Sequence, residues 1–321
     1  MNATVRAPLV PPALWVTMVV LGTAPWWVAR VGLYPYLALE VLIWMIFALG
    51  YNLLLGQSGL PSFGHGAFFG VGAYAFGLAL KGGAGLWGAL GLAILGAAAA
   101  GALVGAFISH RRGIYYALLT IAFGQCFWFV AIKWHTVTGG EDGLLNIRRP
   151  ALVASDTALH FFALGAFVVV TLFLWRLAHS PYGRVLGAIK QNETRAAFVG
   201  YNTWLYKWSA FILSCAIAGV AGALFALAQQ SAYPNVMSLH QSGFVVMMVL
   251  VGGGLVSFWG PVVGAAFFLL ARDLFGAYTE TWLLWYGLLF MAMVIFKPEG
   301  LAGMWRDAMA KWRPSPGRSG A

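Results

Sequence analysis

The chain of 321 residues contains 19 Lys and Arg against 9 Asp and Glu, which gives a formal net charge of +10. Only 9% of its residues are charged and 61% are hydrophobic, whereas soluble proteins are typically about 25% charged. This composition excludes most soluble architectures, because too few polar residues remain to cover a water-facing surface. A membrane helix needs about 20 mostly apolar residues, and five uncharged runs approach or exceed that length: 41–80, 82–110, 113–132, 157–175 and 208–271. Because the runs do not alternate at period two, they favour an all-α, polytopic helical membrane protein over a β-barrel.

The apolar stretches predict eight full spans and one broken pair, and therefore about 8 to 10 transmembrane helices. We expect the first stretch to be retained, because no clear A-x-A cleavage site follows it. The 29 residues of 243–271 are short for two spans, and glycines at 252–254 and Pro261 interrupt them. A re-entrant hairpin is therefore the preferred interpretation there. The expected helices lie near 13–29, 33–55, 62–80, 84–108, 114–132, 158–176, 206–229, 243–271 and 282–296.

Basic residues between the spans indicate the orientation, because Lys and Arg are retained on the cytoplasmic side. Residues 176–207 hold five basic residues against one acid, and 297–321 hold five against two. We place both segments, the N terminus and His110–Arg112 on the cytoplasmic side, which leaves 133–157 outside.

The expected domain organisation follows from this orientation. We expect residues 1–303 to form one transmembrane domain with a cytoplasmic loop at about 177–205. Residues 304–321 form a basic, disordered cytoplasmic tail.

A short sequence echo suggests an internal repeat. Residues 59–63 and 254–258 share the pattern G-L-x-S-F, and both lie in glycine-interrupted segments. Paired broken segments in two halves of a transporter often mark the substrate path. In a chain with 41 glycines, the match can also arise by chance.

Motifs of soluble enzymes are absent from the sequence. No Lys is followed by Ser or Thr, so the chain has no P-loop, and neither H-E-x-x-H nor G-x-S-x-G occurs. Cys126 and Cys215 lie in apolar runs without the C-x-x-C spacing of a metal or redox site. We therefore expect no enzyme, no catalytic or metal-binding residues and no cofactor in this chain.

The most unusual run is 56–74, which predicts a half-helix that lines a substrate path. Pro61 can begin a helix whose free N–H groups favour an anion, and glycines further on permit close helix approach. Tight helix packing alone is the alternative. The expected path residues are Ser62, Phe63, Gly64, His65 and Gly66, with Ser62 and His65 as polar contacts.

Glu40 is added to the expected path residues. It lies inside the span that ends at Leu55, and an acid within a membrane is by default a functional hypothesis. It can equally be neutral, or lie near the outer interface if the helix begins later.

The cytoplasmic loop predicts two capped helices. Ser180-Pro181 reads as an N-cap followed by Pro at the first helical position, and Asn192-Glu193 reads as a second cap. Gly200 is expected to end a short helix that begins at Glu193. Such a helix is marginal in water, so it packs either on a partner protein or on the protein's own helix ends.

Several motifs in order resemble the LivM type of permease subunit in branched-chain amino acid ABC importers. Each motif is weak singly, and their order over roughly 33–303 is specific. They are LGYNLLLG at 49–56, SFGHGAFFGVGAY at 62–74, TGGEDG at 138–143, SPYGR at 180–184, the segment 193–202, YK at 206–207, AGVAGAL at 218–224, GPVVGA at 260–265 and PEGL at 298–301.

The resemblance implies an importer complex in the bacterial inner membrane. Its other members are a second, related permease chain, two ATP-binding cassette ATPase subunits that bind the ATP, and a periplasmic solute-binding protein. It implies contact with membrane lipid and none with nucleic acid, and it implies that Ser62–Gly66 line the path. In such importers a loop with an E-A-A…G pattern docks into the ATPases, and Glu193, Ala196, Ala197 and Gly200 resemble it, with Thr194 and Arg195 interrupting the run.

Other functions stay open from the sequence. A urea or short-chain amide importer has similar permeases, although Phe63, Phe68 and Phe69 weakly favour an aliphatic solute. An ATP-independent carrier or channel would need no docking helix and would use Glu40. A structural scaffold would transport nothing.

Overall fold

A computed structural model describes most of the chain and shows an all-α membrane protein. The expected tail apart from Met304, and the expected cytoplasmic N terminus, lie outside the described part. Leu144 and Ala232 form an isolated antiparallel β-bridge, and the described residues contain no strand. The described residues are 12–28, 30, 34–278, 280–297 and 299–304.

Six helices among the described residues are long and apolar enough to cross a membrane, which confirms the polytopic helical fold. They are α3 (Pro35–Asn52) with its π-helical extension η2 (Leu53–Ser58), α5 (Leu86–Ile108), α6 (Gly113–Lys133), α8 (Asp156–His179), α11 (Thr203–Gln229) and α13 (Gly260–Tyr278). Four apolar helices are shorter: α1 (Pro12–Gly22), α4 (Gly66–Lys81), α12 (Leu239–Gly252) and α14 (Trp282–Phe296). The expected first helix is interrupted at Thr23, after which α2 (Ala24–Trp27) begins.

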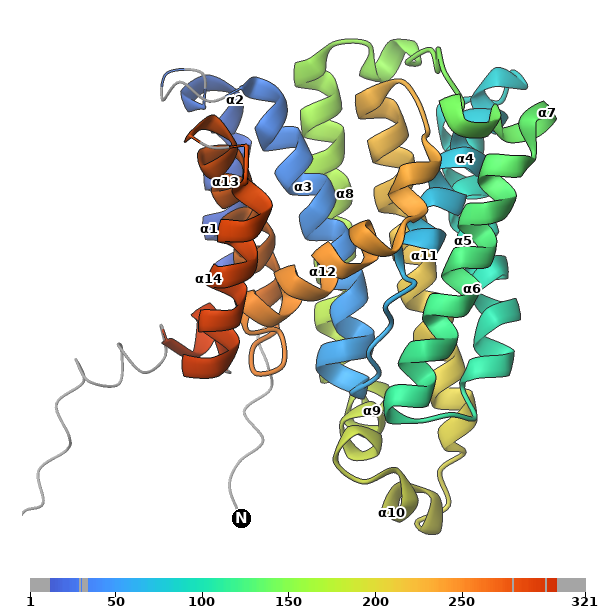
Figure 1. Ribbon diagram of the computed structural model, residues 1–321, viewed down its shortest axis with the longest axis vertical. Helices are drawn as coiled ribbons and strands as arrows, with labels where there is room; N and C mark the ends of the chain where they lie inside the picture. The colour runs from blue at the N-terminus through green and yellow to red at the C-terminus, as the bar shows by residue number, and fades with distance from the viewer. Residues whose placement is uncertain (1–11, 29, 31–33, 279, 298, 305–321) are drawn as a thin grey trace, which may run out of the picture.

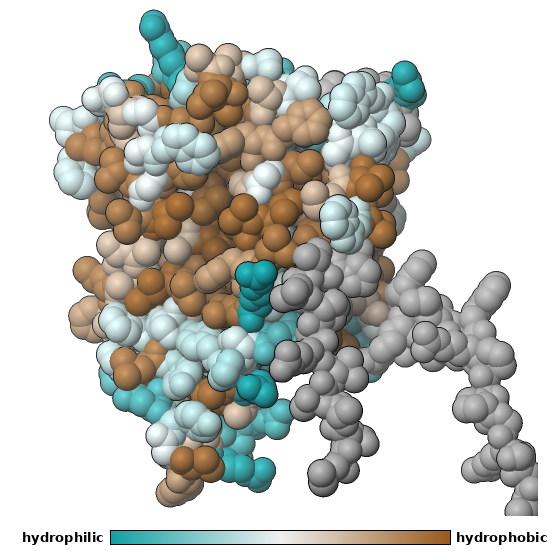
Figure 2. Space-filling model, turned by 180° about the vertical axis from the view of Figure 1, so that it is seen from behind, coloured by the Kyte–Doolittle hydropathy of each residue, from teal (hydrophilic) through white to brown (hydrophobic). Residues whose placement is uncertain are grey.

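The two ends of the bundle carry different connections (Figure 1). The α9 end holds α9 (Pro181–Gln191), α10 (Glu193–Phe198) and the turn between α5 and α6. The opposite α7 end holds α7 (His135–Thr138) with the 3-10 helices η3 (Gly140–Asp142) and η4 (Ala151–Val153). Figure 2 shows hydrophobic side chains in a broad band around the middle and hydrophilic ones mainly towards the two ends, as a lipid environment requires.

Small residues bring the central helices into contact. A Cβ atom added to Gly72 of α4 would meet the backbone of Gly219 in α11, and one on Gly101 of α5 would lie 2.7 Å from Cys215 Cβ. Helices in lipid associate through such close packing, because lipid offers no hydrophobic driving force between them. The glycine and alanine pattern of 218–224 therefore lets α11 pack closely against both α4 and α5, which also contact each other.

Two broken segments enter the bundle from opposite ends (Figure 1). After η2 ends at the α9 end, 59–65 returns to the middle without regular helix, and α4 continues from there to the α7 end. After α11 ends at the α7 end, 230–238, with the 3-10 helix η5 (Pro234–Met237), returns to the middle, and α12 continues to the α9 end. The expected glycine-broken helices are thus present, although the helix expected at 62–80 begins only at Gly66.

The segment expected at 243–271 divides at the predicted place. Gly253 has a φ of +83°, which a side chain would disfavour, and α13 begins after 253–259. The expected end at residue 271 is wrong, because α13 continues through Arg272 and Asp273 to Tyr278. The expectation rested on the end of the uncharged run, and the structure pairs Arg272 with Glu40 and Asp273 instead.

The two copies of the G-L-x-S-F echo occupy different places in their halves. Residues 59–63 come before the short helix α4, whereas 254–258 come after α12. The second copy nevertheless approaches η2, the segment directly before the first copy, where a Cβ on Gly56 would lie 2.6 Å from the carbonyl oxygen of Gly254. We call η2 with 59–65 the first break and 253–259 the second break.

Candidate functional site

The first turns of α4 and α12 meet in the middle of the bundle. The backbone N–H of Gly66 donates to Ser242 Oγ at 2.9 Å, and a Cβ on Gly66 would lie 2.8 Å from that oxygen and 2.9 Å from Val236 O. Ser238 caps α12 by accepting from the N–H of Gln241 at 3.4 Å. Helix N-termini carry partial positive charge, so this crossing favours an anionic group such as a carboxylate. The first N–H groups of α4 are bonded in this conformation to Ser242 and to the carbonyls of Gly64 and His65.

The predicted path residues lie directly before this crossing and are held by named contacts. The N–H of Ser62 donates to Tyr51 Oη at 3.1 Å, and that of Phe63 donates to Thr120 Oγ1 at 3.0 Å. A side chain on Gly64 would collide with the carbonyl of Thr120. Glycine is therefore required at 64 for the close approach of the first break to α6.

His65 is completely buried among aromatic rings. Its Nε2 lies 2.9 Å from Ser214 Oγ, and that hydroxyl donates to Gly50 O at 2.7 Å. Because the single hydroxyl proton of Ser214 is used, Nε2 is the atom that carries the imidazole proton. Nδ1 of His65 and Oγ of Ser62 have no hydrogen-bond partner among the described residues. Ser62 and His65 thus lie in the same segment, and the polar groups of both are buried in this conformation.

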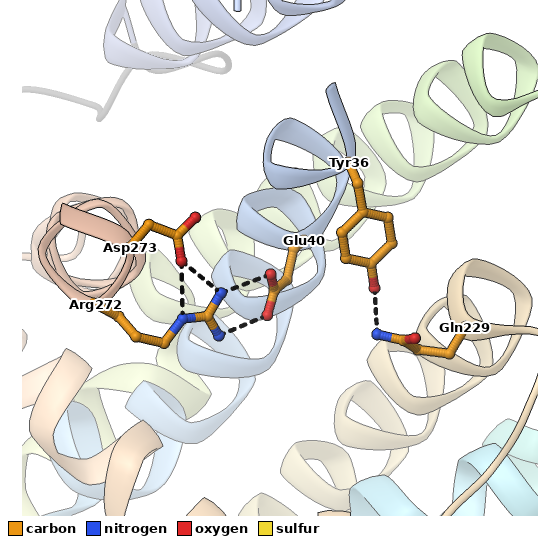
Figure 3. A network of polar contacts seen from close by, with 5 residues as sticks. All are labelled: Tyr36, Glu40, Gln229, Arg272 and Asp273. Atoms are coloured by element: carbon orange, nitrogen blue, oxygen red, sulfur yellow. Dashed lines mark hydrogen bonds and ion pairs between the residues drawn. The ribbon is translucent and has the colours of Figure 1, made fainter. Parts of the chain in front are cut away.

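Glu40 is paired, as Figure 3 shows. Its carboxylate accepts two hydrogen bonds from Arg272 of α13, at 2.8 and 2.9 Å, and Asp273 Oδ1 lies 3.1 Å from the same guanidinium. Glu40 belongs to the second turn of α3 at the α7 end, so of the alternatives left open from the sequence the structure agrees with a position near the end of the span. A bidentate pair of this kind offsets much of the cost of burial. Tyr36, one turn earlier, accepts from Gln229 at 2.7 Å.

The α9 end confirms the two predicted caps. Ser180 accepts from the N–H of Gly183 at 3.4 Å and begins α9, and Asn192 accepts from the N–H of Arg195 at 2.9 Å and begins α10. Gly200 follows α10 with a φ of +101°, the left-handed conformation expected of a terminating glycine.

Two of the predicted docking residues face their own protein. Glu193 lies 2.7 Å from Arg112 Nε and 2.9 Å from Lys207 Nζ, so it ties α10 to the α5–α6 turn and to α11. Ala196 is buried in a small cluster with Val185 and Ile189 of α9.

Of the predicted docking residues, Ala197 is exposed. The two residues that follow it, Phe198 and Val199, were not predicted, and they are 87% and 72% exposed. We call Phe198 and Val199 the apolar tip. The signal was present in the sequence, as two large apolar residues between the polar run 190–195 and Gly200.

Lys190 of α9 was also missed, and it connects the loop to both breaks. Its Nζ donates to Gly56 O in the first break at 2.6 Å and to Leu255 O in the second at 3.3 Å. The partial desolvation of the ammonium lowers the pKa of Lys190 from its usual value. A basic residue between two apolar spans reads as a topology signal, so nothing in the sequence distinguished it.

Metal-binding geometry is not found in the part of the chain that the structure describes. No group of three or more His, Cys, Asp and Glu residues there could hold an ion, and Cys126 and Cys215 are both unpaired thiols.

Comparisons with known proteins point to membrane transport. A family model described as the permease component of a branched-chain amino acid transport system matches residues 34–297. The high-affinity branched-chain amino acid transport system permease proteins LivM of Salmonella typhimurium and Escherichia coli are each 32% identical over 301 residues, which cover 85% of this chain and 71% of theirs. The probable branched-chain amino acid transport permease protein LivM of Methanocaldococcus jannaschii is 23% identical over 81% of this chain and 92% of its own. No solved structure matches the chain.

Proposed function

Because the chain belongs to the family of permease components of branched-chain amino acid transport systems, we propose that it is the permease subunit of an ATP-driven importer of branched-chain or related amino acids. Separate ATPase subunits bind and hydrolyse ATP, and this chain forms part of the solute path. The observation that carries the proposal is the apolar tip, since two large apolar side chains exposed on a polar loop outside the membrane band favour a protein partner.

The contacts of the loop explain how a push on the tip reaches the membrane helices. Glu193 joins α10 to the α5–α6 turn and to α11, while Lys190 joins α9 to both breaks. The short helix α10 is further held on α9 through buried Ala196. A movement of the ATPases against the tip is therefore transmitted to the elements that surround the broken helices.

The solute path runs past the crossing of α4 and α12. The carboxylate of an amino acid is received by N–H groups near that crossing, and the unpartnered polar atoms of Ser62 and His65 become available when the bundle opens. Phe63, which is only partly buried, contacts the aliphatic side chain.

The orientation and the remaining partners complete the proposal. The α9 end faces the cytoplasm, and the α7 end faces the periplasm, where the exposed Glu141 and Asp142 meet the solute-binding protein. The Leu144–Ala232 bridge ties this outer loop to the segment that leads into α12. A second, related permease chain packs beside this one within the bacterial inner membrane.

The test is co-purification from the native host in mild detergent with a C-terminal tag. We expect P-loop ATPase subunits to be recovered with the wild-type chain and lost when Phe198→Asp and Val199→Asp are combined. The matched control is Leu152→Asp, an equally apolar residue that is 69% exposed at the α7 end and is expected to keep the ATPases. Recovery of the chain alone, with ATP-independent transport by vesicles that contain only this chain, would contradict the proposal and support a carrier.

A further inference from the structure

A cavity of about 610 Å³ opens at the α9 end, between the two breaks and the junction of α8 with α9. Four of its fourteen lining residues are glycines, which expose backbone to the cavity. Its lining residues are Asn52, Gly56, Gln57, Ala178, His179, Gly183, Gly187, Lys190, Gln191, Gly254, Leu255, Val256, Ser257 and Phe258. None of these lining residues is acidic.

Lys190 gives the cavity a cationic donor that is not saturated. An ammonium group has three N–H donors, and Lys190 uses two of them for Gly56 O and Leu255 O. The third donor and the positive charge remain for a ligand. A carboxylate is the group that such a site favours, because hydrogen bonds between charged partners are the strong ones.

Two amide oxygens are candidate acceptors for the ammonium group of such a ligand. Asn52 is only 3% exposed and lines the cavity, yet its Oδ1 has no hydrogen-bond partner among the described residues, and neither has Oε1 of Gln57. A buried acceptor without a donor is unfavourable, so it marks a place where a donor is missing. Both oxygens are closed off in this conformation, and when the breaks separate and expose them, an α-ammonium group, with three donors of its own, can satisfy both.

The rest of the lining suits an aliphatic side chain. Leu255, Val256 and Phe258 of the second break form its apolar part. We propose that this cavity is a solute site on the cytoplasmic side, which holds an aliphatic amino acid zwitterion with its carboxylate on Lys190 and its ammonium on Asn52 and Gln57. This inference rests on the proposed function, and it adds a release site that is separate from the crossing of α4 and α12.

The two breaks pack against residues that line the cavity. A Cβ on Gly254 would lie 2.5 Å from Asn52 Oδ1, and one on Gly59 would lie 2.9 Å from Lys190 Cγ. Both breaks therefore pack directly on the two residues that bind the solute. A solute that arrives from the crossing can enter only when the breaks separate. The carboxylate of the solute then binds Lys190 together with the carbonyl groups of Gly56 and Leu255.

The test measures binding of radiolabelled L-leucine to the full chain in lipid nanodiscs. We expect saturable binding that Lys190→Met and Asn52→Leu each weaken at least tenfold, while Lys81→Met, a loss of the same charge at the α7 end, leaves it unchanged. Competition by L-leucinamide, which lacks the carboxylate, and by 4-methylpentanoate, which lacks the ammonium, is expected to be at least tenfold weaker than competition by L-leucine. Absence of L-leucine binding to the wild type, or equal binding to Lys190→Met, overturns the inference.

A second measurement keeps the test decisive if Lys190→Met does not fold. In a Cys126→Ala background, L-leucine should slow maleimide labelling of Val256→Cys inside the cavity and leave Phe198→Cys at the tip unaffected. Equal labelling with and without L-leucine overturns the inference.

Uptake by the complete importer separates this inference from the proposed function. Failure of the wild-type complex to accumulate L-leucine with ATP would contradict the proposed function. Normal wild-type uptake with an unchanged rate and KM in Lys190→Met would remove only the release site.

Discussion

The ammonium of Lys207 lies 2.9 Å from the carboxylate of Glu193, and 1% of the Lys207 side chain is exposed. The same ammonium donates to the carbonyl of Arg111 at 3.2 Å. The pair therefore lies where α10, α11 and the α5–α6 turn meet. A contact at such a junction can transmit force only while both charges are present.

We predict that Glu193→Gln lowers the free energy of unfolding by about 3 kcal/mol, because it leaves Lys207 charged and buried without its acid. Thermal unfolding in detergent measures the loss. The double variant Glu193→Gln with Lys207→Met should recover most of the stability but not the coupling of ATP hydrolysis to uptake. Glu141→Gln, an exposed acid at the α7 end, is the control, and an equal loss in that variant would contradict the assignment.

Gly200 and Gly187 form a second matched pair at the α9 end. A Cβ at either position meets nothing within 4 Å, but only Gly200 has a positive φ, of +101°. Gly200→Ala should therefore destabilise the end of α10 by about 1 kcal/mol through backbone strain, whereas Gly187→Ala in helix α9 should be neutral or stabilising by up to about 1 kcal/mol. Limited proteolysis of the loop measures the difference. Equal behaviour of the two variants would show that the conformation of Gly200 plays no part.

The sequence was sufficient for much of the fold, and the reasons are physical. Long uncharged runs define lipid-facing helices, so the helix at 282–296 is found at the expected bounds, and Ser180 and Asn192 begin α9 and α10 through local capping. Contacts between distant elements leave no local signal. The pairing of Glu40 with Arg272 is one such contact, and it allows α13 to continue past the end of its uncharged run.

In the candidate site, too, the sequence predicted the features with a local signal and missed the contacts between distant elements. The glycine-rich run identified the segment that reaches the crossing of α4 and α12, because close backbone approach selects glycine. Ser242 and Lys190 were missed, since each acts through a hydrogen bond to backbone more than 100 residues away in sequence. Glu193 was identified, but as a residue that faces a partner, whereas its two cationic partners are in this chain.

The ion pair between Glu40 and Arg272 yields a third prediction. Glu40→Gln leaves a partly exposed Arg272 with Asp273 as its remaining partner, so we expect a loss of about 1–2 kcal/mol in stability. The exchange Glu40→Arg with Arg272→Glu should restore part of that loss. ATP-driven uptake should likewise fall in Glu40→Gln and recover in part in the exchange. It should not depend on a proton gradient. Uptake that requires the gradient and disappears in Glu40→Gln, while stability is unchanged, would support an ion-coupled carrier instead.

Ser62 tests the proposed path most directly. The residue is completely buried beside Tyr51 at the start of the crossing, and its hydroxyl has no partner among the described residues. Ser62→Trp should reduce L-leucine uptake at least tenfold, because an indole fills the space through which the solute passes. Overpacking also costs about 1–3 kcal/mol, so uptake is compared with ATP hydrolysis by the same complex. Leu95→Trp on the exposed face of α5 is the control and should leave uptake unchanged. A folded Ser62→Trp complex that hydrolyses ATP without import would place Ser62 on the path, whereas full uptake would move the path away from the crossing of α4 and α12.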